Sequence, residues 1–268
     1  MKTCINGATM MPHPLEKDIE AAGEAGFQGV EIWRDKLGAF LRTRRKEDLK
    51  DLLSTYSLEV AAICPFSGYV WCSEEDFEKK LEETVRYLKV ASYVGCDTLI
   101  VCAEGVEGRS TGEMLEAHAV RLARLADACK DYGVRVAMEW FWNLKDSFMV
   151  IEKANHDYLG VVIDTFHWYR GDRDIASIRS TPRDKLYMVH ISDCENLPRE
   201  TLTDRNRLYC GLGVIPLVEI LRELKGLGYG GYLSVEVFRE EYWKKDPATI
   251  GREALEALRS VMRRASVL

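Results

Sequence analysis

Long hydrophobic runs are absent from this sequence of 268 residues, and none approaches the roughly 20 apolar residues that a membrane-spanning helix needs. The first residues enter a strand-like pattern without the apolar core of a signal peptide. The eight cysteines are scattered and form no CxxC pair. We therefore expect a cytoplasmic protein without a membrane partner, whose thiols are reduced and pack as small apolar groups.

A basic surface is also missing, because 43 Asp and Glu outnumber 37 Lys and Arg and give a formal net charge of −6. Binding to nucleic-acid phosphates depends mainly on Lys and Arg, so we expect no nucleic-acid partner. Apolar residues make up 47% of the chain, which is ample for one sizeable core.

Short apolar runs alternate with longer amphipathic segments along the chain. Runs that are apolar on both faces predict buried parallel strands, at 3–7, 29–33, 59–64, 98–102, 134–140, 160–165, 186–192 and 232–238. Helical patterns lie between them, including 15–25, a segment from 73 or 74 to about 94, and roughly 111–132. Glycines follow these helices and precede the next strand, as in the joints of repeated β–α units.

Eight such units in about 250 residues predict an α/β fold, a single (β/α)8 TIM barrel occupying one domain, residues 1–268. An open doubly wound sheet is the alternative. Its nucleotide-binding form has a GxGxxG motif in the first strand-to-helix turn, and residues 6–9 carry none.

Ionisable residues end four successive predicted strands, the fifth to the eighth. These residues are Glu139, Asp164, His190 and Glu236. Functional side chains of a (β/α)8 barrel lie at the carboxyl ends of its strands, where these four would meet. Buried like charges repel one another unless a cation lies among them, so the pattern predicts a metal site.

Three carboxylates and one imidazole suit one divalent ion such as Mn²⁺, Co²⁺, Mg²⁺ or Zn²⁺. Such an ion polarises the carbonyl of a hydroxy-ketone, acidifies the neighbouring C–H and stabilises the resulting enediolate. Two carboxylates beside the ion can each take or give a proton. The expected activity is therefore proton transfer on a small keto-sugar or keto-polyol, as in an isomerase or epimerase.

The same residues resemble the xylose isomerase-like superfamily of sugar isomerases, epimerases and apurinic-site endonucleases. The resemblance rests on Glu139, the runs 164–167 (DTFH) and 190–193 (HISD), and Glu236. Within that superfamily the chain is similar to the inosose isomerase branch. That likeness rests on 30–33 (VEIW), the stretch 189–204, 207–213 (RLYCGLG) and 234–242 (SVEVFREEY).

The resemblance implies that Glu139, Asp164, His190 and Glu236 bind the metal. It also implies that Glu139 and Glu236 act as proton donor and acceptor on opposite faces of the substrate. His167 and Arg207 would contact substrate oxygens. The chain departs from the family where Cys210-Gly211 replaces the usual Pro-Gly, which affects the loop behind Arg207.

Other polar and aromatic residues lie near the predicted strand ends. We expect Trp33 to form part of an apolar wall against a sugar ring. Asp193 either lies beside the substrate, orienting His190 or His167, or forms a turn. Glu31 and Glu104 are further possible substrate contacts. The histidines at 118 and 156 are expected to be exposed or to cap helices.

Three alternative functions stay open. The same chemistry can expel a β-leaving group, which would make the protein a dehydratase or lyase. An apurinic-site endonuclease needs additional histidines on the third and fourth strands, which end at Cys64-Pro65 and Ala103-Glu104. A non-catalytic sugar-binding barrel would not need the two proton-transferring glutamates. The sequence leaves the native metal and a homo-oligomeric state open.

Overall fold

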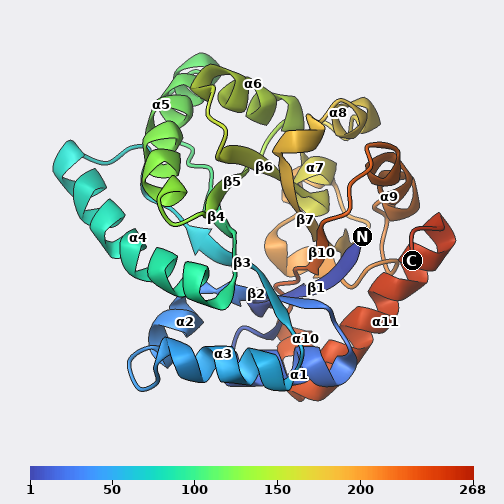
Figure 1. Cartoon of the computed structure of the whole chain (residues 1–268). Coiled ribbons are helices and arrows are strands. Elements are labelled where there is room, and N and C mark those ends of the chain that lie inside the picture. The colour runs from blue at the N-terminus through green and yellow to red at the C-terminus, as the bar shows by residue number, and fades with distance from the viewer.

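The computed structural model describes residues 1–268 and contains a closed barrel of parallel strands wrapped by helices (Figure 1). Neighbouring strands follow the order β1-β10-β7-β6-β5-β4-β3-β2. The barrel strands are β1 (Lys2–Asn6), β2 (Gly29–Trp33), β3 (Glu59–Phe66), β4 (Thr98–Cys102), β5 (Arg135–Glu139), β6 (Leu159–Asp164), β7 (Leu186–Ile191) and β10 (Tyr232–Val235). The predicted (β/α)8 barrel is confirmed.

Helices connect successive strands and cover the outside of the barrel (Figure 1). They are α1 (Leu15–Ala25), α2 (Arg34–Phe40), α3 (Lys46–Thr55), α4 (Glu74–Val94), α5 (Thr111–Lys130), α6 (Leu144–Ala154), α7 (Thr165–Arg170), α8 (Ile175–Arg179), α9 (Leu217–Gly226), α10 (Glu240–Trp243) and α11 (Pro247–Ala265). Ser73 and Ser110 cap the amino ends of α4 and α5 with their hydroxyls. Gly95, with φ of 80°, ends α4 in the left-handed conformation that glycine adopts easily.

The eighth strand is shorter than the sequence predicts, because a side chain replaces its last ladder bonds. Thr9 donates its hydroxyl to the Val235 carbonyl (2.8 Å) and accepts the Val237 N–H (3.1 Å). Glu236 therefore lies just beyond the end of β10. Glu236 directly follows the last residue of β10 and is buried. Its carboxylate therefore lies at the carboxyl end of this strand, as the sequence predicts.

A short antiparallel hairpin follows β7 and was not predicted from the sequence. It pairs β8 (Asp193–Cys194) with β9 (Arg207–Leu208). Two-residue strands are too short for any periodicity to appear in a sequence. The hairpin matters because it brings Arg207 back over the end of the barrel.

The core has two parts, one outside the barrel wall and one inside it. The larger cluster fills the space between strands and helices, as expected for this fold. The smaller cluster lies within the barrel and is built from small and slender residues such as Cys4, Ala62, Cys64 and Ala137. None of the helices is both long and apolar enough to cross a membrane.

Candidate metal centre

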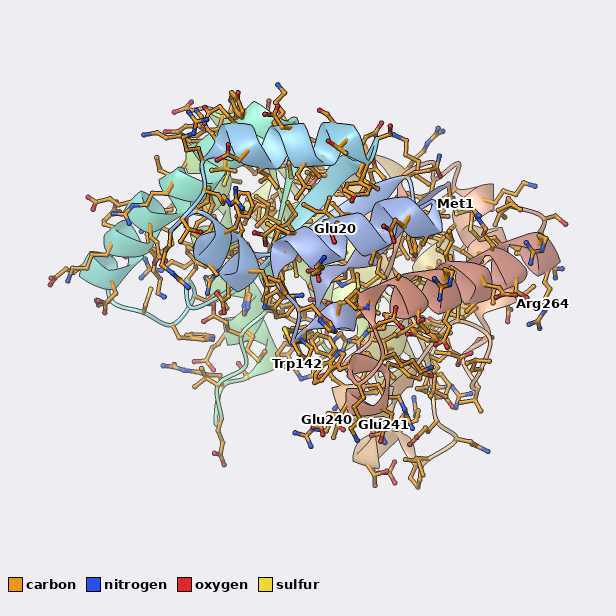
Figure 2. The ribbon with its side chains drawn as sticks, turned by 90° about the horizontal axis from the view of Figure 1, so that it is seen from below. Met1, Glu20, Trp142, Glu240, Glu241 and Arg264 are labelled. Carbon is orange, nitrogen blue, oxygen red and sulfur yellow. The ribbon has the colours of Figure 1, made fainter.

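The candidate site lies at the carboxyl end of the barrel strands. In the view of Figure 2, the loops at this end, with Trp142, Glu240 and Glu241, lie away from Met1, which precedes the first strand. Glu139 and Asp164 are the last residues of β5 and β6, and His190 is the penultimate residue of β7. The four residues that the sequence singles out are brought together, and all are at least 96% buried.

The imidazole of His190 is the centre of this group. Its Nδ1 lies 2.9 Å from Glu139 Oε1, 3.3 Å from Glu236 Oε2 and 3.8 Å from Asp164 Oδ2. Each of the four side chains offers one ligand atom, and these atoms lie within 4.8 Å of one another. Such close carboxylates need a cation for charge balance.

Each carboxylate has one oxygen in this cluster, while the other oxygen is held elsewhere by the protein. Asp164 Oδ1 accepts the N–H groups of Phe166 and His167 (2.7 and 3.0 Å) and so caps α7. Its Oδ2 is left facing His190. Asp164 therefore caps α7 with one oxygen and offers the other oxygen to the candidate metal site.

The two glutamates are held in the same way by residues at the ends of other strands. Asn6 donates its Nδ2–H to Glu236 Oε1 at 3.1 Å. The Cys102 thiol donates to Glu139 Oε2 at 3.6 Å. These contacts fix the orientation of each carboxylate plane, because a carboxylate held at one oxygen presents the other in a defined direction.

The second nitrogen of His190 faces away from the carboxylate cluster. Its Nε2 lies 3.0 Å from Oε1 of Glu31, on β2, and both side chains are completely buried. The expectation that Glu31 contacts substrate is not met, because its carboxylate lies behind the imidazole. Glu31 instead orients the histidine.

The buried charges shift the pKa values of the group in opposite directions. Burial raises the pKa of the Glu236 carboxyl to about 7. Burial also opposes a charged His190, but the carboxylates of Glu236, Glu31 and Glu139 outweigh it and raise the pKa of that imidazole well above its ordinary value. Burial acts on Asp164 too, yet the Arg207 guanidinium holds its carboxyl pKa below the ordinary value.

Arg207 lies fully buried at the edge of the cluster. Its Nη1 donates to Asp164 Oδ2 at 2.8 Å and lies 3.4 Å from Glu236 Oε2. Its Nη2 lies 3.2 Å from Nε2 of His167, a buried imidazole whose pKa is lowered by burial. The Nδ1 of His167 is buried and has no partner in the protein. Both predicted substrate contacts therefore border the cluster, and His167 has a free polar atom.

The other two predicted substrate contacts lie differently. Trp33 ends β2 and packs edge-to-face on Phe238, with ring centroids 5.9 Å apart, beside a cavity of about 530 Å³. Asp193 bonds neither His190 nor His167. Its carboxylate accepts the backbone N–H groups of Cys194, Gly211 and Ile215, which fixes the segment after Arg207.

Gly213 makes this arrangement possible. A Cβ atom at Gly213 would lie 2.0 Å from the Cys194 carbonyl oxygen and 2.5 Å from Asp193 Oδ1. Only glycine allows the segment to approach the hairpin so closely. Asp193 thus anchors a loop, as the turn-forming alternative expects, and it does not orient His190 or His167.

Two further residues stabilise the rim of the site. Glu104 Oε1 accepts the consecutive backbone N–H groups of residues 68, 69 and 70, at 2.7, 2.8 and 3.3 Å. His118 was expected to be exposed or to cap a helix, but it is completely buried. Its Nε2 accepts the Glu104 N–H (2.9 Å), and its Nδ1 lies 2.7 Å from the Met114 carbonyl oxygen. Both residues therefore shape the loops at this end of the barrel.

The donor set fits a divalent cation. Asp164, Glu139 and Glu236 together carry three carboxylates, and the Nδ1 of His190 adds a nitrogen donor. Oxygen-rich sets with one imidazole suit Mn²⁺, Co²⁺, Mg²⁺ and Zn²⁺. Arg207 supplies only one positive charge to this group, so a divalent ion improves the charge balance.

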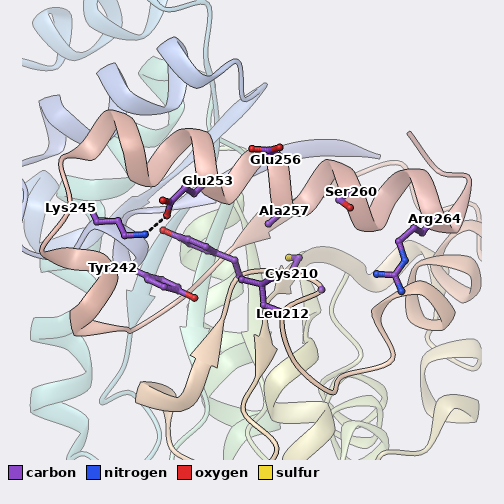
Figure 3. A pocket seen from close by; sticks show the side chains of 11 residues that line it. Cys210, Leu212, Tyr242, Lys245, Glu253, Glu256, Ala257, Ser260 and Arg264 are labelled. Carbon is purple, nitrogen blue, oxygen red and sulfur yellow. Dashed lines mark hydrogen bonds and ion pairs between the residues drawn. The ribbon is translucent and has the colours of Figure 1, made fainter.

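A separate cavity of about 470 Å³ lies between the segment after Arg207 and helix α11 (Figure 3). Tyr209 and Tyr242 stack there, with ring centroids 4.0 Å apart. Lys245 pairs with Glu253 of α11 at 2.6 Å. None of the predicted site residues lines this cavity. The stacked tyrosines join the segment that follows Arg207 to helix α10.

The fold and the cluster define a (β/α)8 barrel with a carboxylate–imidazole centre at the carboxyl ends of its strands. Residues 19–261 match the model of the xylose isomerase-like TIM barrel family, and the chain belongs to that family.

The chain is similar to inosose isomerases over nearly its whole length, as the sequence resemblance indicates. It is 26% identical to the inosose isomerase of Bacillus velezensis, over 96% of this chain and 97% of that protein. It is 26% identical to the 3-dehydroshikimate dehydratase of Pseudomonas putida, over 92% of this chain but only 39% of that longer protein. A crystal structure of the IolI protein with a bound zinc atom superposes with a TM-score of 0.93, at 25% identity and 99% coverage of both chains.

Sequence reasoning missed the contacts that orient the side chains of the cluster. Asn6, Cys102 and Glu31 make these contacts. Asn6 and Cys102 are the last residues of β1 and β4, so their place at a strand end was the available sign. Their partners are 230 and 37 residues away along the chain: pairing of the neighbouring strands β4 and β5 brings Cys102 to Glu139, and closure of the barrel between β1 and β10 brings Asn6 to Glu236.

Proposed function

We propose that this protein is a divalent-metal-dependent isomerase or epimerase of a small keto-sugar or keto-polyol. The observation that carries this proposal is the cluster at His190, where one oxygen from each of three carboxylates surrounds Nδ1. The inosose isomerase relatives and the zinc-containing IolI structure support it.

The metal would be held by Glu139, Asp164, His190 and Glu236. When bound, it would polarise a substrate carbonyl and lower the pKa of the neighbouring C–H. The zinc atom in the IolI structure supports a divalent ion in a protein of this fold. Mn²⁺, Co²⁺, Mg²⁺ and Zn²⁺ all suit the donors, and the native metal is a matter for measurement.

Glu139 and Glu236 are the proposed proton-transferring groups. They come from β5 and from the end of β10, and β6 and β7 lie between these strands in the barrel. The two carboxylates therefore reach the centre from different sides. A substrate lying between them can lose a proton to one and receive a proton from the other, which inverts a carbon centre. A single carboxylate can instead move a proton between adjacent carbons.

Arg207 and His167 are the proposed groups that orient the substrate. Arg207 is fixed by Asp164 and donates toward His167, which leaves the free Nδ1 of His167 for a substrate oxygen. Phe141 packs on the His167 ring at a centroid distance of 4.5 Å and limits the access of water on that side. Exclusion of water strengthens the electrostatic interactions of the site.

The first experiment is the metal content of the purified protein, followed by deuterium exchange from solvent into a panel of ketoses and inososes. We expect about one equivalent of divalent metal and an exchange that stops when a chelator removes it. Glu236→Gln should lower exchange by a factor of 10² or more, the usual contribution of a positioned acid or base. Glu240→Gln, on the exposed helix α10, is the matched control and should exchange like the wild type.

Full exchange by Glu236→Gln with metal bound would contradict the role of two carboxylates. Dehydration of a related keto-polyol is the second candidate, because the Pseudomonas putida relative is a dehydratase. Mass spectrometry separates the two reactions. An isomerised or epimerised product keeps the mass of the substrate, whereas a dehydrated product is lighter by one water.

A further inference from the structure

A further cavity is lined by Trp140, the residue that follows Glu139 in the sequence. It has a volume of about 450 Å³ and lies between the loop that follows β4 and the loop that follows β5. Its aromatic lining consists of Trp140 and Trp142. Both loops are at the carboxyl end of the barrel, so the cavity opens on the same end as the metal centre.

One stretch of chain connects the cavity to the metal centre. Trp140 directly follows Glu139, and Phe141 packs on His167 beside the cluster. Trp142 is the next residue and lines the cavity. Three residues of extended chain span at most about 11 Å. A substrate with one further ring beyond its reacting part can therefore reach from Glu139 to Trp142.

The two indoles have different surroundings. Trp142 is 38% exposed, an unusual exposure for so large an aromatic side chain at the edge of a candidate active site. Trp140 is 96% buried and meets Trp142 edge-to-face, with centroids 5.1 Å apart. Together they form an apolar surface on which a ring can stack.

Trp140 also has an unused hydrogen-bond donor. Its Nε1–H is buried and has no acceptor in the protein, although buried indole N–H groups usually have one. The nearest imidazole cannot serve, because His118 already accepts the Glu104 N–H at Nε2 and contacts the Met114 carbonyl through Nδ1. A ligand oxygen in the cavity would supply the missing acceptor.

The remaining polar side chains make the lining of the cavity acidic. Glu107, Asp146 and Asn143 line it, and no Lys or Arg does. Nearby cations are paired elsewhere, since Lys145 bonds Asp174 at 2.6 Å and Arg109 pairs with Glu113 at 3.1 Å. Carboxylate and amide groups accept hydrogen bonds from hydroxyls and repel anions. The cavity therefore suits a neutral, hydroxyl-bearing ring and disfavours phosphates and carboxylates.

We propose that this cavity binds an uncharged glycosyl ring attached to the reacting keto-sugar, so that the substrate is a keto-glycoside. This inference rests on the proposed function, because it names the substrate class of the same site. The glycosyl ring stacks on Trp142, its hydroxyls bond Asp146 and Asn143, and one of its oxygens accepts the Trp140 N–H.

Binding is tested first without turnover, by calorimetry on the metal-loaded protein with cellobiose, glucose, glucosamine and glucose 6-phosphate as probes. We expect cellobiose to bind most tightly and glucose 6-phosphate most weakly. Trp142→Ala should weaken cellobiose binding at least tenfold, in line with the loss of a stacked aromatic contact, and Trp142→Phe should restore part of it. Met149→Ala, an exposed residue of α6 outside the cavity, is the matched control and should bind like the wild type.

Turnover is tested with a 3-keto-disaccharide and an inosose, by deuterium exchange. The ratio of their KM values should rise at least tenfold in Trp142→Ala and stay constant in Met149→Ala. The glycosyl site would be overturned if Trp142→Ala left the ratio of the two KM values unchanged. It would also be overturned if Trp142→Ala bound cellobiose as tightly as the wild type does. Tighter binding of glucosamine or glucose 6-phosphate than of cellobiose would contradict the proposal that the bound ring is uncharged. Absence of exchange with every ketose would count against the proposed function alone, because the calorimetric result does not depend on turnover.

Discussion

The Nε2 nitrogen of His190 lies 3.0 Å from Oε1 of Glu31, and neither side chain has any exposed surface. This contact gives Nε2 an acceptor and leaves Nδ1 facing Glu139, Asp164 and Glu236. A histidine that binds a metal through one nitrogen commonly donates its other N–H to a carboxylate, which fixes the tautomer and the ring orientation. Glu31 is placed to fill that role if His190 binds a metal through Nδ1.

Glu31→Gln tests this positioning role. A neutral amide is a weaker acceptor for the Nε2–H than a carboxylate, so the imidazole becomes a poorer ligand. We expect the dissociation constant for Zn²⁺ or Mn²⁺ to rise about 10–100-fold. Competition with a chromogenic chelator measures it directly. Glu59→Gln is the control, because Glu59 lies at the start of β3 and pairs with Lys2, and it should bind metal like the wild type. Equal affinities in all three proteins would exclude the role of Glu31.

Arg207→Met tests the balance of charge in the centre. The guanidinium is buried and compensates Asp164 and Glu236, so its removal leaves carboxylates without a partner. Such a loss costs about 3–5 kcal/mol of the free energy of unfolding. A divalent metal replaces the missing positive charge, so added metal should raise the melting temperature of the variant more than that of the wild type.

The comparison uses protein treated with a chelator and then titrated with Mn²⁺ or Zn²⁺. Arg205→Met is the matched control, because Arg205 precedes the same hairpin strand but is exposed and pairs only with Glu240. Its melting temperature should respond to metal as the wild type does. If metal raised the melting temperature of Arg207→Met no more than that of Arg205→Met, the Arg207 guanidinium and the metal would not interact with the same carboxylates.

The cluster of candidate ligands could be predicted from the sequence because each of its members interrupts an apolar strand at or near its end. Glu139, Asp164 and His190 have that pattern, and a parallel barrel gathers all strand ends of one polarity. Asn6 and Cys102 support the glutamates from neighbouring strands, whereas Glu31 supports His190 from a strand that is not its neighbour. Glu31 reaches His190 from β2, and β1 and β10 separate β2 from β7 in the barrel wall. Local patterns in a sequence do not encode such cross-barrel pairs.

For Asp193 the sequence leaves two roles open, and the structure favours the loop-forming one. Its position two residues after β7 resembled that of a site residue, and its carboxylate is buried. Its partners are backbone N–H groups of Gly211 and Ile215, which belong to a loop without periodicity. The short β8–β9 hairpin decides this geometry, and nothing in the residue pattern predicts where a two-residue strand pairs.

Glu104→Ala should loosen the rim of the site without affecting the metal. The carboxylate accepts three consecutive backbone N–H groups at residues 68–70, and hydrogen bonds to a charged group contribute about 1.5–3 kcal/mol each at most. Because these amides are only partly buried and water can replace the carboxylate, we expect a loss smaller than the sum of the three bonds, roughly 2–3 kcal/mol in the free energy of unfolding, and faster hydrogen exchange at those amides. Mass-resolved exchange of the peptide around residue 69 measures the second effect. Unchanged exchange there would show that the loop holds its shape by packing alone.

Asp18→Asn should change how stability depends on pH. Asp18 is buried, and both its oxygens contact the Lys36 ammonium (2.6 and 2.9 Å), which also donates to the carbonyls of Gly7 and Met10. Burial outweighs Lys36 and raises the pKa of Asp18 to about 7. A carboxyl whose pKa is higher in the folded chain than in the unfolded chain stabilises the fold at low pH. This contribution is complete below the unfolded pKa of about 3.9 and is lost as the pH rises through about 7.

As the pH rises from about 5 to about 8, the free energy of unfolding of the wild type should fall by roughly 2–3 kcal/mol more than that of Asp18→Asn. The asparagine stays neutral over this range, so the difference between the two proteins isolates the titration of Asp18. Urea unfolding at several pH values measures it. Asp51→Asn, an exposed position on α3, controls for the loss of a carboxylate and should follow the wild type. A difference between wild type and Asp18→Asn that does not vary with pH would mean that Lys36 keeps Asp18 ionised throughout, and that the buried ion pair outweighs the cost of burial.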